Sequence, residues 1–187
     1  MQDPVREISS VVKGLVQARN ATEQRDTLER HFAPDASFDH PLCTVVSGPN
    51  SRDAGLLPIY QWLRCMFTPQ IEVHNVGFDK EANKLFLDAS QKLTPNIFPL
   101  SRVYAPVVRL IVVLFLQRGA DGKFYIKRQE DYYEPQTLPG KLVPGGELIV
   151  TSIKRIAAFN CMLLTIFFGL ILGFWRPVGR GVAPIKN

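Results

Sequence analysis

The fold class is decided by one stretch: VVRLIVVLFLQR (107–118), GADG (119–122) and KFYIKRQEDYY (123–133). Both longer segments are rich in β-branched and aromatic residues, which fit a pleated, half-buried surface. The Asp-Gly pair between them is a strong hairpin signal. The stretch therefore predicts a long antiparallel pair of strands, Val107 to Arg118 and Lys123 to Tyr133.

A second hairpin is predicted just upstream. QIEVHNVGF (70–78) and LFLDASQKL (85–93) alternate between apolar and polar residues, and the turn-rich segment 79–83 joins them. From residue 136 to residue 146 the chain is rich in Pro and Gly and is typical of a linker. The central part of the chain is thus predicted to be a meandering, mostly antiparallel sheet.

The segment before the strands has helical spacing. We expect three helices, with Thr22 and Ser51 as caps of the second and third and Pro58 as a kink or a delayed start in the third: Val5 to Val16, Glu23 to about Phe32, and Asp53 to Phe67. Helices followed by strands indicate an α+β fold in which the helices cover one face of the sheet.

An apolar run near the end of the chain predicts a transmembrane helix. IAAFNCMLLTIFFGLILGFW (156–175) contains no ionisable side chain and has about the length that crosses the hydrocarbon core of a bilayer. The alternative is a buried core helix, but too little chain remains to surround a helix that is apolar on every side. We therefore expect four parts: a pocket domain (1–135), a linker (136–155), the membrane helix (156–175) and a short basic tail (176–187).

The positive charge gathers around that run. Residues 1–153 hold seventeen Lys/Arg and seventeen Asp/Glu, so the whole excess of +5 lies on residues that flank the apolar segment: Lys154, Arg155, Arg176, Arg180 and Lys186. Such residues suit lipid head groups. A neutral domain lacks the basic face that nucleic acid requires, so we expect membrane lipid as a partner and no nucleic acid.

The N-terminal segment and the apolar run also predict where the protein lies in the cell. MQDPVREISS at the N-terminus has no apolar region typical of a secretory signal. A single apolar helix near the C-terminus predicts a tail anchor with the domain in the cytosol, although two basic residues precede the helix and three follow it, which slightly opposes that orientation. We expect the endoplasmic reticulum in preference to the mitochondrial outer membrane or the peroxisome. Cys43, Cys65 and Cys161 are expected to be free thiols.

Two further motifs carry a family resemblance. HFAPDASFDHPLC (31–43) and KRQEDYYEP (127–135) resemble the nuclear-transport-factor-two-like, or SnoaL-like, superfamily, and Pro144-Gly145-Gly146 narrows the resemblance to its fungal SigF-like family. The resemblance implies a cone in which helices and a strongly curved sheet enclose an apolar pocket. Members of the superfamily range from isomerases, cyclases, dehydratases and epoxide hydrolases to binding domains, and they often dimerise through the sheet.

Three residues are candidates for acid–base catalysis in such a pocket: Asp39, His40 and Asp131. A carboxylate beside an imidazole gives a base with an orienting partner, and an apolar surrounding shifts the pKa of either group. Asp131 is a candidate through the resemblance, because several superfamily enzymes place an acidic residue at the end of the last long strand. The alternative is that Asp39 ends a strand and that His40 bonds backbone at the rim of the pocket.

Three more residues are candidate ligand-binding groups: Tyr60, Asp88 and Arg109. A guanidinium within an apolar strand is costly unless it is paired, and Asp88 or Asp131 would be its partner. The alternative is a structural ion pair or an arginine at a sheet edge. Ile111 stands where the limonene-epoxide-hydrolase pattern would need a carboxylate, which argues against epoxide hydrolysis.

No cofactor or metal is expected. The three histidines are dispersed, and the chain has no phosphate-binding loop, dinucleotide motif or nucleophile elbow. One hypothesis is a membrane-tethered pocket domain that binds or converts a lipophilic small molecule by isomerisation, cyclisation or dehydration. The other is a non-catalytic adaptor or homodimer. A cavity lined by Asp39, His40 or Arg109 would favour the first hypothesis, and a filled cone with those groups outside it would favour the second.

Overall fold

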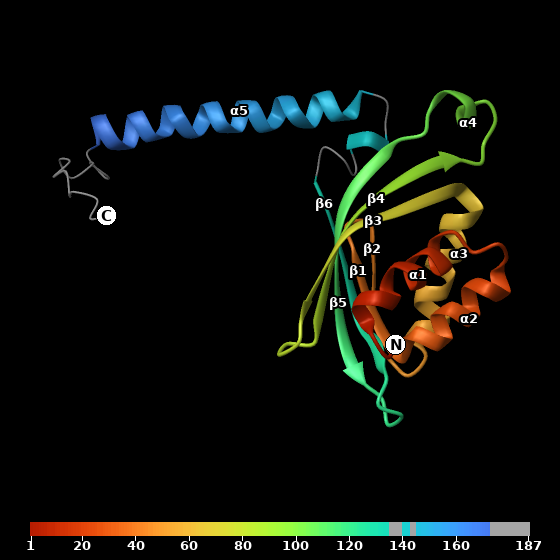
Figure 1. The fold of residues 1–187 in the computed structure, drawn as a ribbon. Helices are drawn as coiled ribbons and strands as arrows, with labels where there is room; N and C mark the ends of the chain where they lie inside the picture. Colours follow the sequence, from red (N-terminus) through yellow and green to blue (C-terminus); the bar gives the residue numbers. More distant parts are fainter. Residues whose placement is uncertain (135–139, 143–144, 173–187) are drawn as a thin grey trace, which may run out of the picture.

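The computed structural model describes residues 1–134, 140–142 and 145–172. A curved, six-stranded sheet carries three helices on its inner face (Figure 1), so the predicted α+β class is confirmed. The helices are α1 (Pro4–Val16), α2 (Ala21–His31) and α3 (Leu57–Met66). The strands are β1 (Phe32–His40), β2 (Cys43–Val45), β3 (Phe67–Asp79), β4 (Lys84–Pro95), β5 (Val107–Arg118) and β6 (Phe124–Tyr133).

The strand order is β2-β1-β6-β5-β4-β3, and only the β1–β6 pair is parallel. Both predicted hairpins are confirmed. β5 and β6 pair antiparallel around the predicted turn, where Gly122 has a φ of +76°, a left-handed value that glycine adopts without steric cost. β3 and β4 extend beyond the predicted ends, because their ladder continues from Phe67–Pro95 to Asp79–Lys84.

The first two strands were not among the predicted strands. β1 contains Pro34, which cannot donate to a sheet ladder, so the segment lacks an obvious strand signature. The structure accommodates the proline at a bulge, since the β1–β6 register shifts between Phe32 and Ser37. Alternation is present only after the bulge, where Ala36 and Phe38 are buried and Ser37 between them is not.

The N-terminal capping of α2 and α3 differs from the prediction. α2 is capped by Asn20 rather than Thr22, because the Asn20 side chain accepts a hydrogen bond of 2.9 Å from the backbone N–H of Glu23. Ser51 makes no capping bond, and a five-residue π-helical turn, η1 (Arg52–Leu56), precedes α3. Pro58 lies in the first turn of α3, so the delayed helix start is confirmed.

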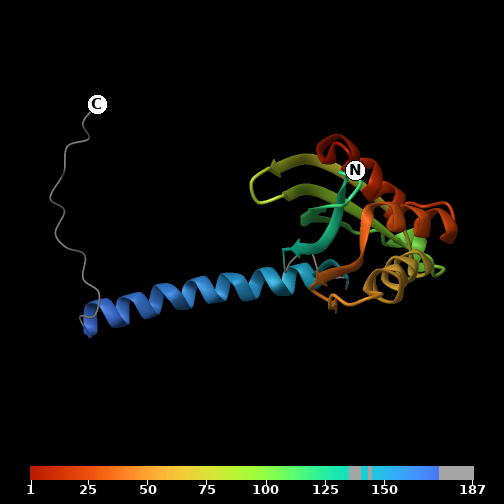
Figure 2. The same ribbon diagram turned by 90° about the horizontal axis from the view of Figure 1, so that it is seen from below.

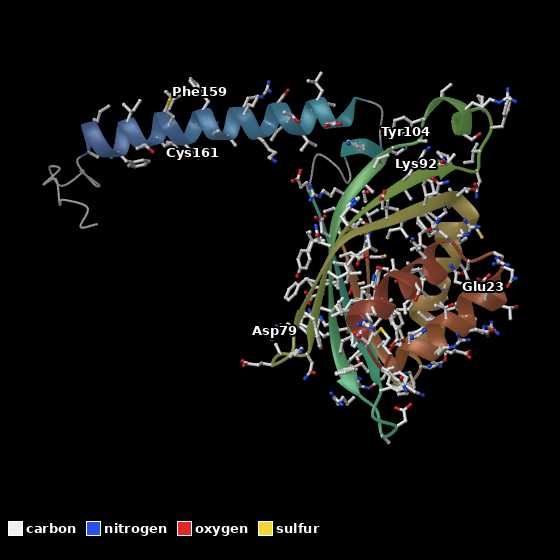
Figure 3. The ribbon with its side chains drawn as sticks, in the orientation of Figure 1. Glu23, Asp79, Lys92, Tyr104, Phe159 and Cys161 are labelled. Atoms are coloured by element: carbon white, nitrogen blue, oxygen red, sulfur yellow. The ribbon has the colours of Figure 1, made fainter. Side chains whose placement is uncertain are left out.

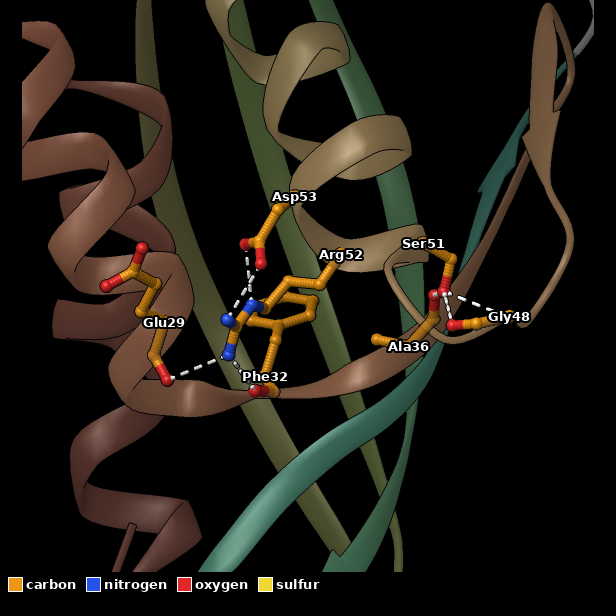
Figure 4. Close-up of polar contacts among 7 residues, drawn as sticks. All are labelled: Glu29, Phe32, Ala36, Gly48, Ser51, Arg52 and Asp53. Atoms are coloured by element: carbon orange, nitrogen blue, oxygen red, sulfur yellow. Dashed lines mark hydrogen bonds and ion pairs between the residues drawn. The ribbon is translucent and has the colours of Figure 1, made fainter.

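Polar contacts fasten this helix start to β1 (Figure 4). The Ser51 hydroxyl donates to the carbonyl of Ala36 at 2.6 Å. Arg52 pairs with Asp53 at 2.8 Å, and its guanidinium also donates to the carbonyls of Glu29 and Phe32, each at 3.4 Å. These bonds hold α3 over the inner face of the sheet and so position the side chains of that helix.

An apolar core lies between the helices and the sheet, and the side chains of the described residues are drawn in Figure 3. Inward positions on β4 and β5 alternate with outward ones. Leu85, Leu87, Ala89, Leu110 and Leu114 are all buried on the inner side. The order of inward and outward residues decides which polar side chains reach the interior.

The last described helix is α5 (Gly146–Ile166), which continues into the π-helical turn η3 (Phe167–Ile171). Residues Gly146–Gly169 are long and apolar enough to cross a membrane, and none of them is buried. The helix projects away from the sheet (Figures 1 and 2), and Phe159 and Cys161 point into open space (Figure 3). A core helix is therefore excluded for this segment.

The helix begins earlier than predicted. Residues 146–155, which we expected to belong to a linker, form the first part of α5, because no residue after Gly145 and Gly146 interrupts a helix there. Residues 140–142 form a short 3-10 turn, η2, and Leu100–Val103 form the short helix α4. The end of the predicted membrane run (173–175) and the basic tail lie outside the described residues.

Candidate functional site

A cavity of about 570 Å³ lies between the inner face of the sheet and helices α1 and α3. All six strands contribute to its walls, which are mainly aliphatic and aromatic. The apolar residues come from the two helices and from β1, β3, β4, β5 and β6: Val11, Val12, Leu15, Val16, Phe32, Phe38, Ile59, Leu63, Phe67, Ile71, Leu93, Leu110, Val112, Leu114 and Ile126. Leu42 and Trp62 line the cavity yet are more than half exposed, so they lie at its mouth. The size and apolar lining suit a small lipophilic molecule.

One side of the cavity carries a chain of hydrogen bonds. The Tyr60 hydroxyl on α3 donates to Oε1 of Gln129 at 2.9 Å, and Nε2 of Gln129 donates to Oδ1 of Asp131 at 2.9 Å. Gln129 and Asp131 are two residues apart on β6 and therefore face the same side of the sheet. All three side chains line the cavity. The bond from Gln129 leaves Oδ2 as the oxygen of Asp131 that can meet a ligand.

The protonation of these groups follows from their burial. Desolvation raises the pKa of Asp131 to about 7, against the smaller lowering effect of the bond from Gln129. The pKa values of Tyr60 and Tyr133 are raised, first by desolvation and then by the charge of Asp131, so both phenols stay protonated. Asp131 thus exchanges its proton near neutral pH, where an acid–base catalyst is most effective.

His40 reaches the cavity from β1. Its neighbour in sequence, Asp39, pairs with Glu130 across the parallel β1–β6 ladder, so His40 stands beside Asp131 on the adjoining strand. The backbone N–H of Leu42 donates to Nδ1 of His40 at 3.1 Å, which assigns the remaining ring proton to Nε2. Burial lowers the pKa of His40, despite an opposing effect from Asp39. The imidazole is therefore a neutral donor at the cavity wall.

Three predicted site residues lie on the outer face of the sheet. Asp39 is exposed and does not line the cavity, because Phe38 and His40 on either side of it point inward. Arg109 binds Asp88 through a bidentate ion pair with a shortest distance of 2.6 Å, so the expected pair exists, but it lies outside the cavity. Arg109 points outward because Val108 and Leu110 occupy the inward positions of β5.

Sequence reasoning missed four polar groups of the cavity: Cys43, Gln91, Gln129 and Tyr133. Strand alternation could have identified Gln129 and Tyr133, since each is two residues from Asp131. The same rule places Gln91 with Ala89 and Leu93 on the inner face of β4. Cys43 could not be placed in this way, because β2 was not predicted.

Histidine and cysteine chemistry outside the cavity is limited. His74 is exposed and shares a hydrogen bond of 2.7 Å with Ser90. Cys65 and Cys161, like Cys43 at the cavity, are free cysteines. Within the described residues, no group of three or more His, Cys, Asp or Glu side chains is arranged to hold a metal ion.

Comparisons with known proteins agree with this architecture. The model of the SigF NTF2-like domain family matches residues 1–174. A putative polyketide cyclase from Xanthomonas campestris pv. campestris is 15% identical over 75% of this chain and 100% of that one, with a TM-score of 0.54.

Two further solved structures share the fold. An LEH-like epoxide hydrolase from M. tuberculosis is 14% identical over 80% of this chain and 99% of that one, with a TM-score of 0.53. A putative scytalone dehydratase from Novosphingobium aromaticivorans DSM 12444 is 13% identical over 69% of this chain and 83% of that one, with a TM-score of 0.52. A comparison with curated protein sequences finds no match. The family match covers nearly the whole chain, which therefore belongs to the SigF NTF2-like domain family.

Proposed function

We propose that this chain is a membrane-tethered pocket domain that binds a lipophilic small molecule and converts it by proton transfer without a cofactor. The observation that carries the proposal is Asp131, an acid with a pKa of about 7 at the wall of an apolar cavity. Isomerisation, cyclisation and dehydration all require a proton to be taken from carbon or given to oxygen. The names of the similar polyketide cyclase and scytalone dehydratase support this class of reaction.

In the proposed proton transfer each polar residue of the cavity has its own role. Asp131 takes or gives the proton through Oδ2, while Gln129 and Tyr60 hold Oδ1 in place. The Nε2–H of His40 on the adjoining strand donates to the oxygen on which negative charge develops. The aliphatic walls exclude water and strengthen both interactions. Because Asp39, Asp88 and Arg109 lie outside the cavity, this mechanism does not include them.

The exposed apolar helix α5 supports the membrane tether. A ligand that partitions into the bilayer would be concentrated beside a domain that is anchored there. We propose a single pass with the domain on the cytosolic side, and the endoplasmic reticulum as the membrane. Lys154 and Arg155, which precede the apolar run, would then lie among the lipid head groups on the side of the domain.

The proposal predicts exchange of carbon-bound hydrogen. The full chain in lipid nanodiscs is incubated in D₂O with a panel of lipophilic cyclic ketones, and deuterium uptake is followed by mass spectrometry. Asp131→Asn should abolish any uptake that the wild-type chain accelerates. Asp88→Asn removes a carboxylate from the outer face and should have no effect. Equal uptake with wild-type protein and with Asp131→Asn would refute the assigned role.

A second candidate is an adaptor that assembles through its sheet. Phe86, Ile111 and Tyr132 are 41–54% exposed on the outer face of the sheet, and large apolar side chains gathered on one face can form an interface. The three side chains lie on neighbouring strands and would contribute the apolar part of a homodimer interface, with the Asp88–Arg109 ion pair beside them. Analytical ultracentrifugation of the full chain in detergent would show a dimer that Ile111→Asp converts to a monomer, whereas a monomeric wild-type chain would exclude this assembly.

A further inference from the structure

Gln91 presents a side-chain amide to the cavity, and no described residue forms a hydrogen bond with it. The residue is 6% exposed, lies on the inner face of β4 and lines the cavity. Its side chain has no hydrogen-bond partner among the described residues, whereas both polar atoms of Gln129 are bonded. Its polar atoms keep accessible surface and are therefore open to water or to a ligand in the cavity. The neighbouring inward residues on its strand, Ala89 and Leu93, are apolar, so Gln91 is the polar group at this end of the strand.

Gln91 and Asp131 lie on the same inner face of the sheet but far from each other. Gln91 pairs with Val108 on β5, and Asp131 pairs with Val112 on the same strand. The two positions are four residues apart along β5 and lie on the strands on either side of it, so their Cα atoms are about 17 Å apart. After both side chains reach toward the cavity, the gap between amide and carboxyl is on the order of 10 Å.

We propose that Gln91 is a second polar anchor of the cavity, which binds a hydroxyl or carbonyl group at the end of the ligand opposite the group that reacts at Asp131. This inference rests on the proposed function and narrows its substrate class. The ligand is an elongated apolar molecule with a hydrogen-bonding oxygen near each end. A compact ligand or one with a single polar end would leave the Gln91 amide unsatisfied, and the complex would be weaker.

The test uses two rigid probes with the same apolar body. 4,4′-Dihydroxybiphenyl carries oxygens at both ends, separated by about the gap between the two anchors, and 4-hydroxybiphenyl carries one. Calorimetry with the full chain in nanodiscs, corrected with empty nanodiscs, gives both affinities. Because a neutral hydrogen bond is worth about 1 kcal/mol, the wild-type chain should bind the two-ended probe roughly threefold to tenfold more tightly.

The variants assign that preference to one residue. Gln91→Met conserves the volume of the side chain and should remove the preference without weakening the binding of 4-hydroxybiphenyl. Gln117→Met makes the same change at an exposed position on β5 and should retain the preference. Thermal unfolding in the same nanodiscs establishes that each variant is folded.

The outcomes separate this inference from the proposed function. If neither probe binds to the wild-type chain, the proposed cavity function fails. If the probes bind with equal affinity, or if Gln91→Met keeps the preference, the anchor proposal alone is overturned and trapped water satisfies the amide.

Discussion

Replacement of Asp131 by Asn should stabilise the protein at alkaline pH and leave it unchanged at acidic pH. The pKa of Asp131 is about 7 in the folded chain, against an ordinary value of 3.8. Well below pH 4 the carboxyl is protonated in both the folded and unfolded states, so burial carries no ionisation penalty. Between pH 4 and 7 only the unfolded chain ionises, and the free energy of unfolding falls by about 1.4 kcal/mol per pH unit.

Above pH 7 the penalty is complete and amounts to about 4 kcal/mol as an upper estimate. At pH 5 it is between 1 and 2 kcal/mol by the same relation, so Asp131→Asn should gain roughly 3 kcal/mol more at pH 8 than at pH 5. Thermal and denaturant unfolding of the full chain in one detergent, at both pH values, measures this difference.

Asp88→Asn is the matched control. The ion pair with Arg109 lowers the pKa of Asp88, so this carboxyl is ionised in both states between pH 5 and 8 and its removal should add no pH dependence in that range. A difference between wild type and Asp131→Asn that does not change with pH would refute the placement of an ionisable acid in an apolar cavity.

Three further substitutions test the fold and the tether. Tyr60→Phe leaves the buried Oε1 of Gln129 without its donor and should lower the free energy of unfolding by about 1–3 kcal/mol in denaturant titrations. Gly122→Ala forces a Cβ into the left-handed turn at φ +76° and should cost about 1–2 kcal/mol in the same assay. Leu164→Arg places a charge within the apolar helix, adds about 3 kcal/mol to the free energy of membrane insertion, and should increase the fraction that alkaline carbonate releases from membranes.

The sheet was predictable where local signals agree. β5 and β6 have β-branched residues, a strong turn and a matching register, so both strands were placed to within one residue. β1 was not predicted, since Pro34 breaks the local pattern and the strand pairs along much of its length with β6, which is distant in the sequence. The early start of α5 was missed because the membrane argument considered only residues without charge, whereas Lys154 and Arg155 are also good helix formers.

The site shows the same division between local and long-range information. Alternation within one strand is enough to place Asp131 and Gln129 on one face. Arg109 was misplaced because β5 is apolar on both faces: Ile111 is 41% exposed, so the sequence does not distinguish inside from outside. The bond between Tyr60 and Gln129 joins residues from α3 and β6, and only the fold brings them together.

The central claim, that the cavity holds a lipophilic molecule beside Asp131, is tested most directly by two matched tryptophan substitutions on β5. Val112 pairs with Asp131 and lines the cavity, whereas Val113 faces the other side of the sheet. The full chain is purified in native membrane discs, and organic extracts are compared by mass spectrometry. A lipophilic molecule should accompany the wild-type chain and Val113→Trp and should be depleted from Val112→Trp. Equal recovery from all three proteins would contradict the account.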